Sequence, residues 1–273
     1  MRTSKQIKGR YLGYRDADRA EPYAGFFNPQ LAPLPAHAAA ALLRGAVPEP
    51  LVPGLDGAAA ALFKDTGALE DGYVLLPDGG MRVAIRTDMP NVTPAMIDWW
   101  FAWHGDAAAK YKLWHPQAHV NAAWAQSPPV GAQGRDAYVG RTSIVDEWIG
   151  GDFIRGAIQF VAPEAIGLGD PSLADPSAAT IVCARVGVTE APVNVGVLAH
   201  HVRTVPGGAE MRSRFWMGGA HIKPRNAFAG PAAAIARRTL KLTEADARAV
   251  LVHCAQEMQH LAGLLPALHA AFA

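Results

Sequence analysis

The pattern that most constrains this fold is a run of short β-type segments followed by one long helical segment. Five segments are rich in β-branched and aromatic residues and are separated by turn signals such as Gly150-Gly151 and Pro206-Gly207-Gly208. They cover residues 138–149, 153–161, 180–188, 193–204 and 209–217. The helix begins at Thr243, where Thr243-Glu244-Ala245-Asp246 matches a capping box. We therefore expect an α+β fold in which a curved antiparallel sheet grips the C-terminal helix, with a ligand cavity between them.

The region before these strands divides into two parts. Residues 1–85 are loop-rich and broken by prolines, and only Ala36–Arg44 has a clear helical pattern. A hairpin is expected over residues 75–85, turning at 77–80. Thr93-Pro94 then favours a helix start, and the Pro after His115 ends a second, short helix. We predict a small N-terminal lobe at 1–85 and a helix-grip domain at 86–273.

Composition excludes several classes of protein. The chain has 273 residues, 25 basic and 24 acidic side chains, and a formal charge of +1, without the basic stripe of a nucleic-acid binder. Its two cysteines cannot build a disulfide framework. Neither a signal-peptide core nor a run of eighteen apolar residues is present, which predicts a cytoplasmic protein without a membrane span. Whether the chain forms a homo-oligomer stays open.

Two histidine-containing clusters are candidates for metal binding. His253 and Glu257 stand four residues apart in the C-terminal helix, so both can point at one ion, although an exposed surface pair has the same spacing. His115 and His119 have this spacing too, but Pro116 interrupts a helix through both. The residues alone do not decide which of these two histidines is a ligand.

Strand alternation selects two further candidates. If Val145 and Ile149 face the interior, Glu147 does so as well and requires a cation; otherwise it lies outside, paired with an arginine. Of the neighbours His200 and His201 only one can enter the cavity, and His200 shares its face with Leu198 and Val202.

At this point the chain resembles the zinc-dependent diacetylphloroglucinol and phloretin hydrolases over roughly residues 85–265. The motifs that carry the resemblance are residues 98–104, 111–119, 141–151, 200–203, 212–218 and 253–257. The resemblance implies a Bet v 1-like helix-grip domain holding one Zn²⁺. It implies the metal ligands His119, Glu147, His253 and Glu257, a catalytic His200, and a catalytic, substrate-contacting Tyr111.

Two substrate-contacting positions depart from the family pattern. Phe215 stands where the hydrolase of diacetylphloroglucinol has a second tyrosine, and the family's asparagine falls at Ala122, next to Asn121. Phe215 and Asn121 are therefore the expected substrate-binding residues besides Tyr111, and a different acylated phenol is the expected substrate.

The resemblance predicts an enzyme, a hydrolase acting on the carbon–carbon bond between a polyhydroxylated ring and an acyl group. Its partner would be a small phenolic ketone, and its products a phenol and a carboxylic acid. Two alternatives are a non-catalytic helix-grip module for an apolar or aromatic ligand, and a non-haem iron oxygenase with two histidines and one carboxylate.

Overall fold

The computed structural model describes residues 10–64 and 68–273, and the first nine residues of the predicted N-terminal lobe lie outside this part. The helices are α1 (Asp16–Arg19), α2 (Ala36–Arg44), α3 (Ala58–Phe63), α4 (Pro94–Trp103), α5 (Ala108–Trp114), α6 (Gly230–Thr239) and α7 (Glu244–Phe272). The strands are β1 (Gly72–Leu75), β2 (Met81–Pro90), β3 (His119–Trp124), β4 (Thr142–Ile149), β5 (Asp152–Val161), β6 (Ala179–Val188), β7 (Val193–Val205), β8 (Gly208–Met217) and β9 (Lys223–Pro224). Short 3₁₀ turns connect several of them.

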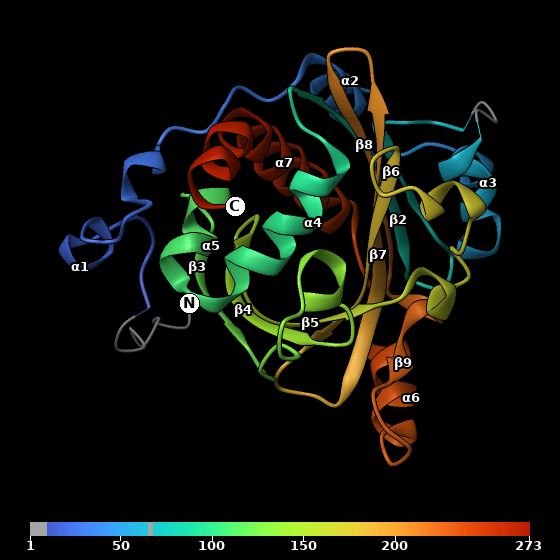
Figure 1. Cartoon of the computed structure of the whole chain (residues 1–273). Helices are drawn as coiled ribbons and strands as arrows, with labels where there is room; N and C mark the ends of the chain where they lie inside the picture. Colours follow the sequence, from blue (N-terminus) through green and yellow to red (C-terminus); the bar gives the residue numbers. More distant parts are fainter. Residues whose placement is uncertain (1–9, 65–67) are drawn as a thin grey trace.

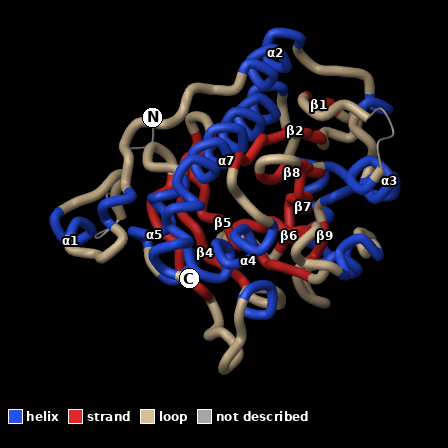
Figure 2. The backbone as a smooth tube through the Cα atoms, turned by 45° about the horizontal axis from the view of Figure 1, so that its top comes forward, coloured by secondary structure: helices blue, strands red, loops and turns tan. Residues whose placement is uncertain are grey.

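All the described strands belong to one antiparallel sheet. Its order is β1-β2-β8-β7-β6-β5-β4-β3, and β9 pairs with the start of β7. Helix α7 lies across one face and packs against β1, β2, β4, α4 and α5 (Figures 1 and 2). The expected α+β helix-grip fold is thus confirmed.

Helix α7 is held by its cap and by its buried face. The Thr243 hydroxyl accepts from the backbone N–H of Asp246, whose carboxylate accepts from the N–H and hydroxyl of Thr243. Leu251, Met258 and Leu261 are fully buried against the sheet. Because burial of a leucine side chain stabilises the fold by about 1.5–3 kcal/mol, packing of this apolar face, rather than intrinsic helix propensity, holds α7 against the sheet.

The local predictions around α4 and α5 are confirmed. Thr93 caps α4 through its side chain and Pro94 occupies the first turn, while α5 ends at Trp114, before His115 and Pro116. These two helices close one end of the space between α7 and the sheet, and α5 leads directly into β3.

The predicted hairpin is confirmed as β1 and β2, but it does not belong to a separate lobe. Strand β2 pairs with β8 over its whole length, so the sheet begins at Gly72 and the predicted boundary at residue 85 falls inside β2. Upstream, α3 lies on the sheet face opposite α7 (Figure 1). Its Leu62 belongs to the same buried cluster as Trp216 of β8. Among the described helices, none has the length and apolarity needed to cross a bilayer.

Candidate metal centre and active site

Four side chains from three elements meet at the end of the space between α7 and the sheet. His119 is the first residue of β3, and its direct cross-strand partner on β4 is Glu147. His253 and Glu257 lie one turn apart on α7, which crosses this end of the two strands. Strand pairing therefore brings the first two donors together, and the helix brings the other two over them.

The distances between these donors fit one metal ion. His119 Nε2 lies 3.4 Å from Glu147 Oε2 and 3.5 Å from Glu257 Oε2, and His253 Nε2 lies 3.4 and 3.7 Å from the same two oxygens. Bond lengths of about 2.0–2.2 Å in a tetrahedral site imply donor separations of roughly 3.3–3.6 Å. An octahedral Mg²⁺ site would bring neighbouring donors to about 3 Å. His119, Glu147 and His253 thus form a group that could hold a metal, with Glu257 beside it.

The electrostatics of the cluster also favour a cation. His119 is fully buried, and its Nε2 has no hydrogen-bond partner among the described residues. Although burial alone would lower the pKa of His119, its contacts with Glu147 and Glu257 raise it to about 9. Burial alone would raise the pKa of Glu147, but His119 and His253 hold it well below its usual range. Two carboxylates among apolar walls are costly without a positive charge, which a divalent ion supplies in full.

Tyr111 supports this cluster from α5. Its ring stacks on the His119 ring at 3.7 Å, and its backbone oxygen lies 3.0 Å from His119 Nδ1. This contact leaves His119 Nε2 to face the other donors, as in most metal-binding histidines. The Tyr111 hydroxyl donates to Glu147 at 2.8 Å. Burial and the Glu147 charge raise the Tyr111 pKa well above its ordinary value, so the phenol stays protonated.

A largely apolar cavity extends from the cluster between α7 and the sheet. Its lining includes Phe101, Trp114, Val145, Ile149, Ile158, Phe160, Leu198, Phe215 and Met217, together with Tyr111, Glu147, His200, His253 and Glu257. Strand alternation predicted that Glu147 shares a face with Val145 and Ile149, and His200 with Leu198. In the structure all five side chains line the cavity. The Phe215 ring meets the His200 ring edge-on at 5.8 Å. Burial lowers the pKa of His200 to about 3, so its ring is neutral at ordinary pH.

Asn121 does not reach this cavity. A bulge at Val120 shifts the register of β3, so that His119 pairs with Glu147 and Asn121 with Asp146, the next residue back along β4. The bulge re-aims the side chains that follow it, so Asn121 lies opposite Asp146, whose carboxylate pairs with Arg10 rather than facing the cavity. Ala122 is buried in the main core instead. The structure thus does not bring the predicted substrate contact of Asn121 to the cavity.

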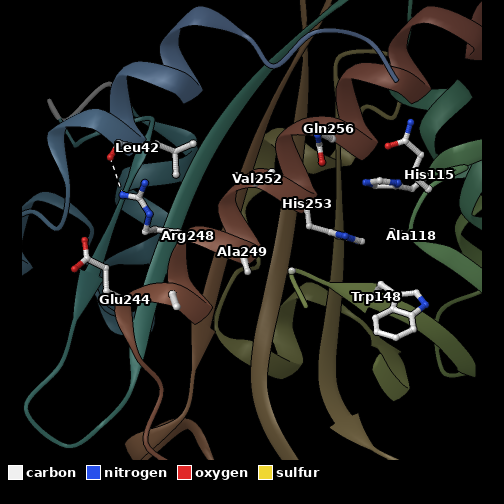
Figure 3. Close-up of a pocket in the computed structure, with 13 residues that line it drawn as sticks. Leu42, His115, Ala118, Trp148, Glu244, Arg248, Ala249, Val252, His253 and Gln256 are labelled. Atoms are coloured by element: carbon white, nitrogen blue, oxygen red, sulfur yellow. Dashed lines mark hydrogen bonds between the residues drawn. The ribbon is translucent and has the colours of Figure 1, made fainter. Parts of the chain in front are cut away.

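His115 lies beside the cluster rather than in it. Its ring stacks on His253 at 4.9 Å, and it falls outside the group of potential ligands. Figure 3 shows it at the edge of a second, more open pocket, which also contains Trp148, Arg248 and Gln256. His253 lines both pockets, so the cluster has the apolar cavity on one side and a wider, more polar opening on the other.

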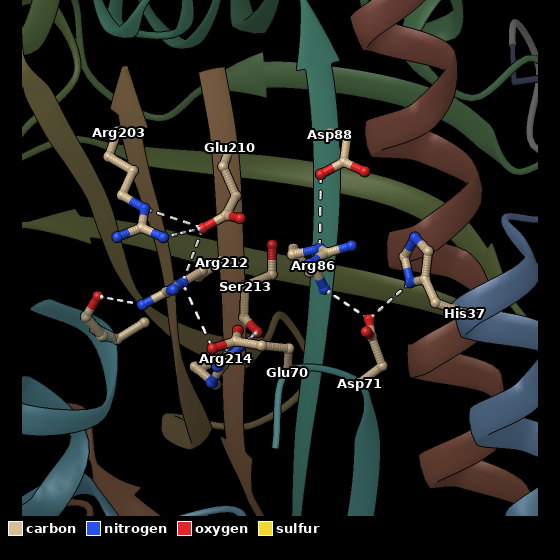
Figure 4. Close-up of polar contacts among 11 residues, drawn as sticks. His37, Glu70, Asp71, Arg86, Asp88, Arg203, Glu210, Arg212, Ser213 and Arg214 are labelled. Carbon is tan, nitrogen blue, oxygen red and sulfur yellow. Dashed lines mark hydrogen bonds and ion pairs between the residues drawn. The ribbon is translucent and has the colours of Figure 1, made fainter. Parts of the chain in front are cut away.

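Two buried arginines of β8, Arg212 and Arg214, point away from the cavity and belong to a separate ionic network on the opposite face of the sheet. Arg214 pairs with Glu70 at 2.8 Å, and Arg212 pairs with Glu210 at 3.0 Å (Figure 4). His201 lies on this face and packs against Phe63. This network ties the segment after α3 to the sheet and is remote from the cavity.

Comparisons with known proteins show which family this chain belongs to. The family profile for the DAPG hydrolase PhiG domain matches residues 52–270. The chain belongs to this family. It is 28% identical over 272 residues to a 2,4-diacetylphloroglucinol hydrolase of a Pseudomonas species, covering 96% of this chain and 92% of that protein. It is 26% identical over 214 residues to phloretin hydrolase of Eubacterium ramulus, covering 76% of each. The predicted resemblance is therefore confirmed.

Among solved structures, a major latex-like protein from Panax ginseng aligns with this DAPG hydrolase family member at a TM-score of 0.36 and 13% identity. The alignment covers 67% of this chain and 99% of that protein. The helix-grip assignment follows from the strand order and the position of α7, not from this similarity.

Sequence reasoning missed three polar groups in or beside the cavity. His104 and Ser143 line it, and Ser213 lies opposite His200 on β8. Ser213 alternates with Arg212 and Arg214 and shares the face of Phe215, so strand periodicity alone could have placed it inside. His104 follows α4 in a short 3₁₀ turn, where neither helix nor strand periodicity predicts the direction of its side chain.

Proposed function

We propose that this chain is a zinc-dependent hydrolase that cleaves the bond between a polyhydroxylated aromatic ring and an acyl carbonyl. The observation that carries the proposal is the meeting of His119, Glu147 and His253, with Glu257 beside them at 3.5 to 3.7 Å from the two histidines, next to an apolar cavity that also contains a neutral histidine. The two carboxylates would neutralise a divalent ion, and the buried Nε2 of His119, which faces both of them, would become a ligand atom once the metal displaces its proton. The relatives named as hydrolases of diacetylphloroglucinol and phloretin support the substrate class.

In the reaction, the ring–acyl bond breaks, its electron pair stays on the ring, and water supplies the hydroxyl of the carboxylic acid. A bare aryl anion is a very poor leaving group, so the ring carbon must be protonated first, which a polyhydroxylated ring allows through its keto tautomer. A bound zinc ion would supply polarisation of the acyl oxygen and acidification of water. His200 would bring the proton to the ring carbon, directly or as a shuttle, while the apolar walls exclude bulk water.

Tyr111 would hold the ring hydroxyl nearest the metal. Its phenol stays protonated and donates to Glu147 in this structure, so the phenol oxygen can accept a hydrogen bond from a ring hydroxyl while Glu147 stays oriented. Phe215 would pack on the ring without a hydrogen bond, and the cavity would favour an acylated phenol with few polar groups facing β8.

The first experiment measures metal content by elemental analysis of the wild type, His253→Ala and Glu244→Gln. Glu244 stands on the first turn of the same helix and bonds Tyr73, so its variant is a matched control. About one zinc per chain is expected in the wild type and control, and much less in His253→Ala. Acylphloroglucinols are then screened for release of a carboxylic acid.

The two alternatives predict different results. Protein purified without chelators that holds no stoichiometric metal, yet binds an aromatic ligand, would be a binding module and would refute the hydrolase. Turnover that requires oxygen and iron would indicate an oxygenase, whereas hydrolysis proceeds unchanged under nitrogen.

A further inference from the structure

The hydroxyl of Ser213 is in contact with His200, a histidine that lines the cavity without joining the metal cluster. His200 and Ser213 are direct cross-strand partners on β7 and β8, and His200 Nδ1 lies 2.7 Å from Ser213 Oγ. Ser213 is fully buried, and His200 is only 3% exposed. Because the protein occupies Nδ1, the ring nitrogen left for a molecule in the cavity is Nε2.

A histidine that moves a proton from one substrate atom to another needs a lone pair on the nitrogen that faces the substrate. With the proton on Nδ1, Nε2 can take a proton from a ring hydroxyl and release it to the ring carbon, and the imidazole is regenerated. With the proton on Nε2, the ring cannot accept a proton there, and releasing its own would leave an imidazolate. Only the Nδ1–H form therefore serves as a shuttle.

We propose that Ser213 is a positioning residue that accepts a hydrogen bond from His200 Nδ1–H and thereby directs the Nε2 lone pair of His200 into the cavity. This inference rests on the proposed function, and it assigns His200 one role, proton transfer from a ring hydroxyl to the ring carbon. The proton that leaves the oxygen is the one that arrives at carbon, so no further acid or base is needed.

The surroundings of Ser213 support this direction. Its hydroxyl also lies beside the side chain of Cys254 on α7, whose sulfur offers the serine proton an acceptor when Oγ accepts from His200. The His200 ring is confined between Phe101, whose ring stacks at 6.3 Å, and Phe215. These two rings restrict the orientation of the imidazole ring, and the hydrogen bond to Ser213 then determines which of its nitrogens carries the proton.

Nuclear magnetic resonance of the zinc-loaded, ¹⁵N-histidine-labelled full chain tests the tautomer without any substrate. His200 is assigned as the signal pair missing from His200→Gln. We expect a protonated Nδ1 and an unprotonated Nε2 in the wild type, and a shift toward the other tautomer in Ser213→Ala. A wild-type His200 with its proton on Nε2 overturns the proposal, whatever the activity.

Kinetics provide the second readout. Ser213→Ala is expected to lower kcat by about 10-fold or more with little change in KM, within the range that a positioned proton-transfer group contributes. Ser213→Thr keeps the hydroxyl and should restore both kcat and the tautomer. Thr87→Val, which removes a buried hydroxyl of β2 outside the cavity, is the matched control and should leave kcat unchanged.

The two proposals fail in different ways. A wild type that hydrolyses no acylated phenol refutes the proposed function, while the tautomer can still be read. A wild type that hydrolyses such a substrate, with Ser213→Ala equal to it in kcat and tautomer, refutes the role of Ser213 alone. Should Ser213→Thr not fold, Ser213→Cys, with its weaker acceptor, should fall between wild type and alanine.

Discussion

Zinc and a proton should compete for His119, and the structure sets the size of this competition. Contacts with Glu147 and Glu257 outweigh burial and raise the His119 pKa to about 9 in the metal-free protein. At pH 7 the imidazole therefore carries a proton that a metal must displace. Since pH 7 lies about two units below this pKa, the displacement costs about 3 kcal/mol.

The expected result is release of at least about one proton per zinc bound at pH 7. The Kd for zinc should also weaken about tenfold for each unit by which the pH falls below 9. Proton release is measured by calorimetric titration of the chelator-stripped protein in two buffers of different ionisation enthalpy, with a competing chelator to bring the affinity into range.

Two variants show where the proton resides. His200→Gln removes a buried neutral histidine outside the cluster and should release as many protons as the wild type. Glu147→Gln removes one of the carboxylates that raise the His119 pKa and should release fewer, besides binding zinc more weakly. Zinc binding without proton release, with an affinity that is flat between pH 7 and 9, would refute this account of the cluster.

Three further predictions concern specificity, stability and acid sensitivity. Phe215→Tyr adds a hydroxyl to the cavity wall and should raise kcat/KM for diacetylphloroglucinol about 2- to 10-fold, the effect of one additional hydrogen bond. An equal or lower kcat/KM in steady-state assays would contradict the assignment of this wall to the substrate ring. Thr243→Ala removes the cap of α7 and should lower the free energy of unfolding by about 1 kcal/mol in urea titrations, and an unchanged midpoint would count against the capping box. Burial lowers the pKa of His104 and His200 to about 3, so the unfolded chain binds more protons between pH 6.5 and 3 and stability should fall as the pH falls through this window. His200→Gln should reduce that slope by about 1.4 kcal/mol per pH unit, whereas an unchanged slope would show that His200 is protonated in the fold.

Local signals predicted the elements that carry most of the site. The capping box at Thr243 and the spacing of His253 and Glu257 are properties of one helix, so no distant contact is needed to find them. Alternation in β4 and β7 likewise follows from backbone geometry, which is why the sequence could group Glu147 with Val145 and Ile149, and His200 with Leu198, although it left open whether Glu147 faces inward.

Long-range pairing could not be predicted in the same way. Strand β3 has the sequence His-Val-Asn-Ala-Ala-Trp, in which only Val120 and Trp124 favour a strand, and it forms because β4 pairs with it. The hairpin of β1 and β2 was clear locally, but nothing in its residues shows that β8 is its neighbour. The choice between His115 and His119 depends on the same pairing, since His119 enters the cluster as the cross-strand partner of Glu147.

The bulge at Val120 has the largest consequence for specificity. Without it, His119 and Asn121 would share a face by simple alternation, and the asparagine would enter the cavity beside the metal ligand. With it, Asn121 is the cross-strand partner of Asp146, and the buried residue at this point of β3 is Ala122. Phe215 makes the opposite wall apolar as well. Under the proposed function, recognition of ring hydroxyls would fall to the polar side chains that line the cavity, those of Tyr111, His200, His104 and Ser143, and we expect a preference for substrates whose hydroxyls face them.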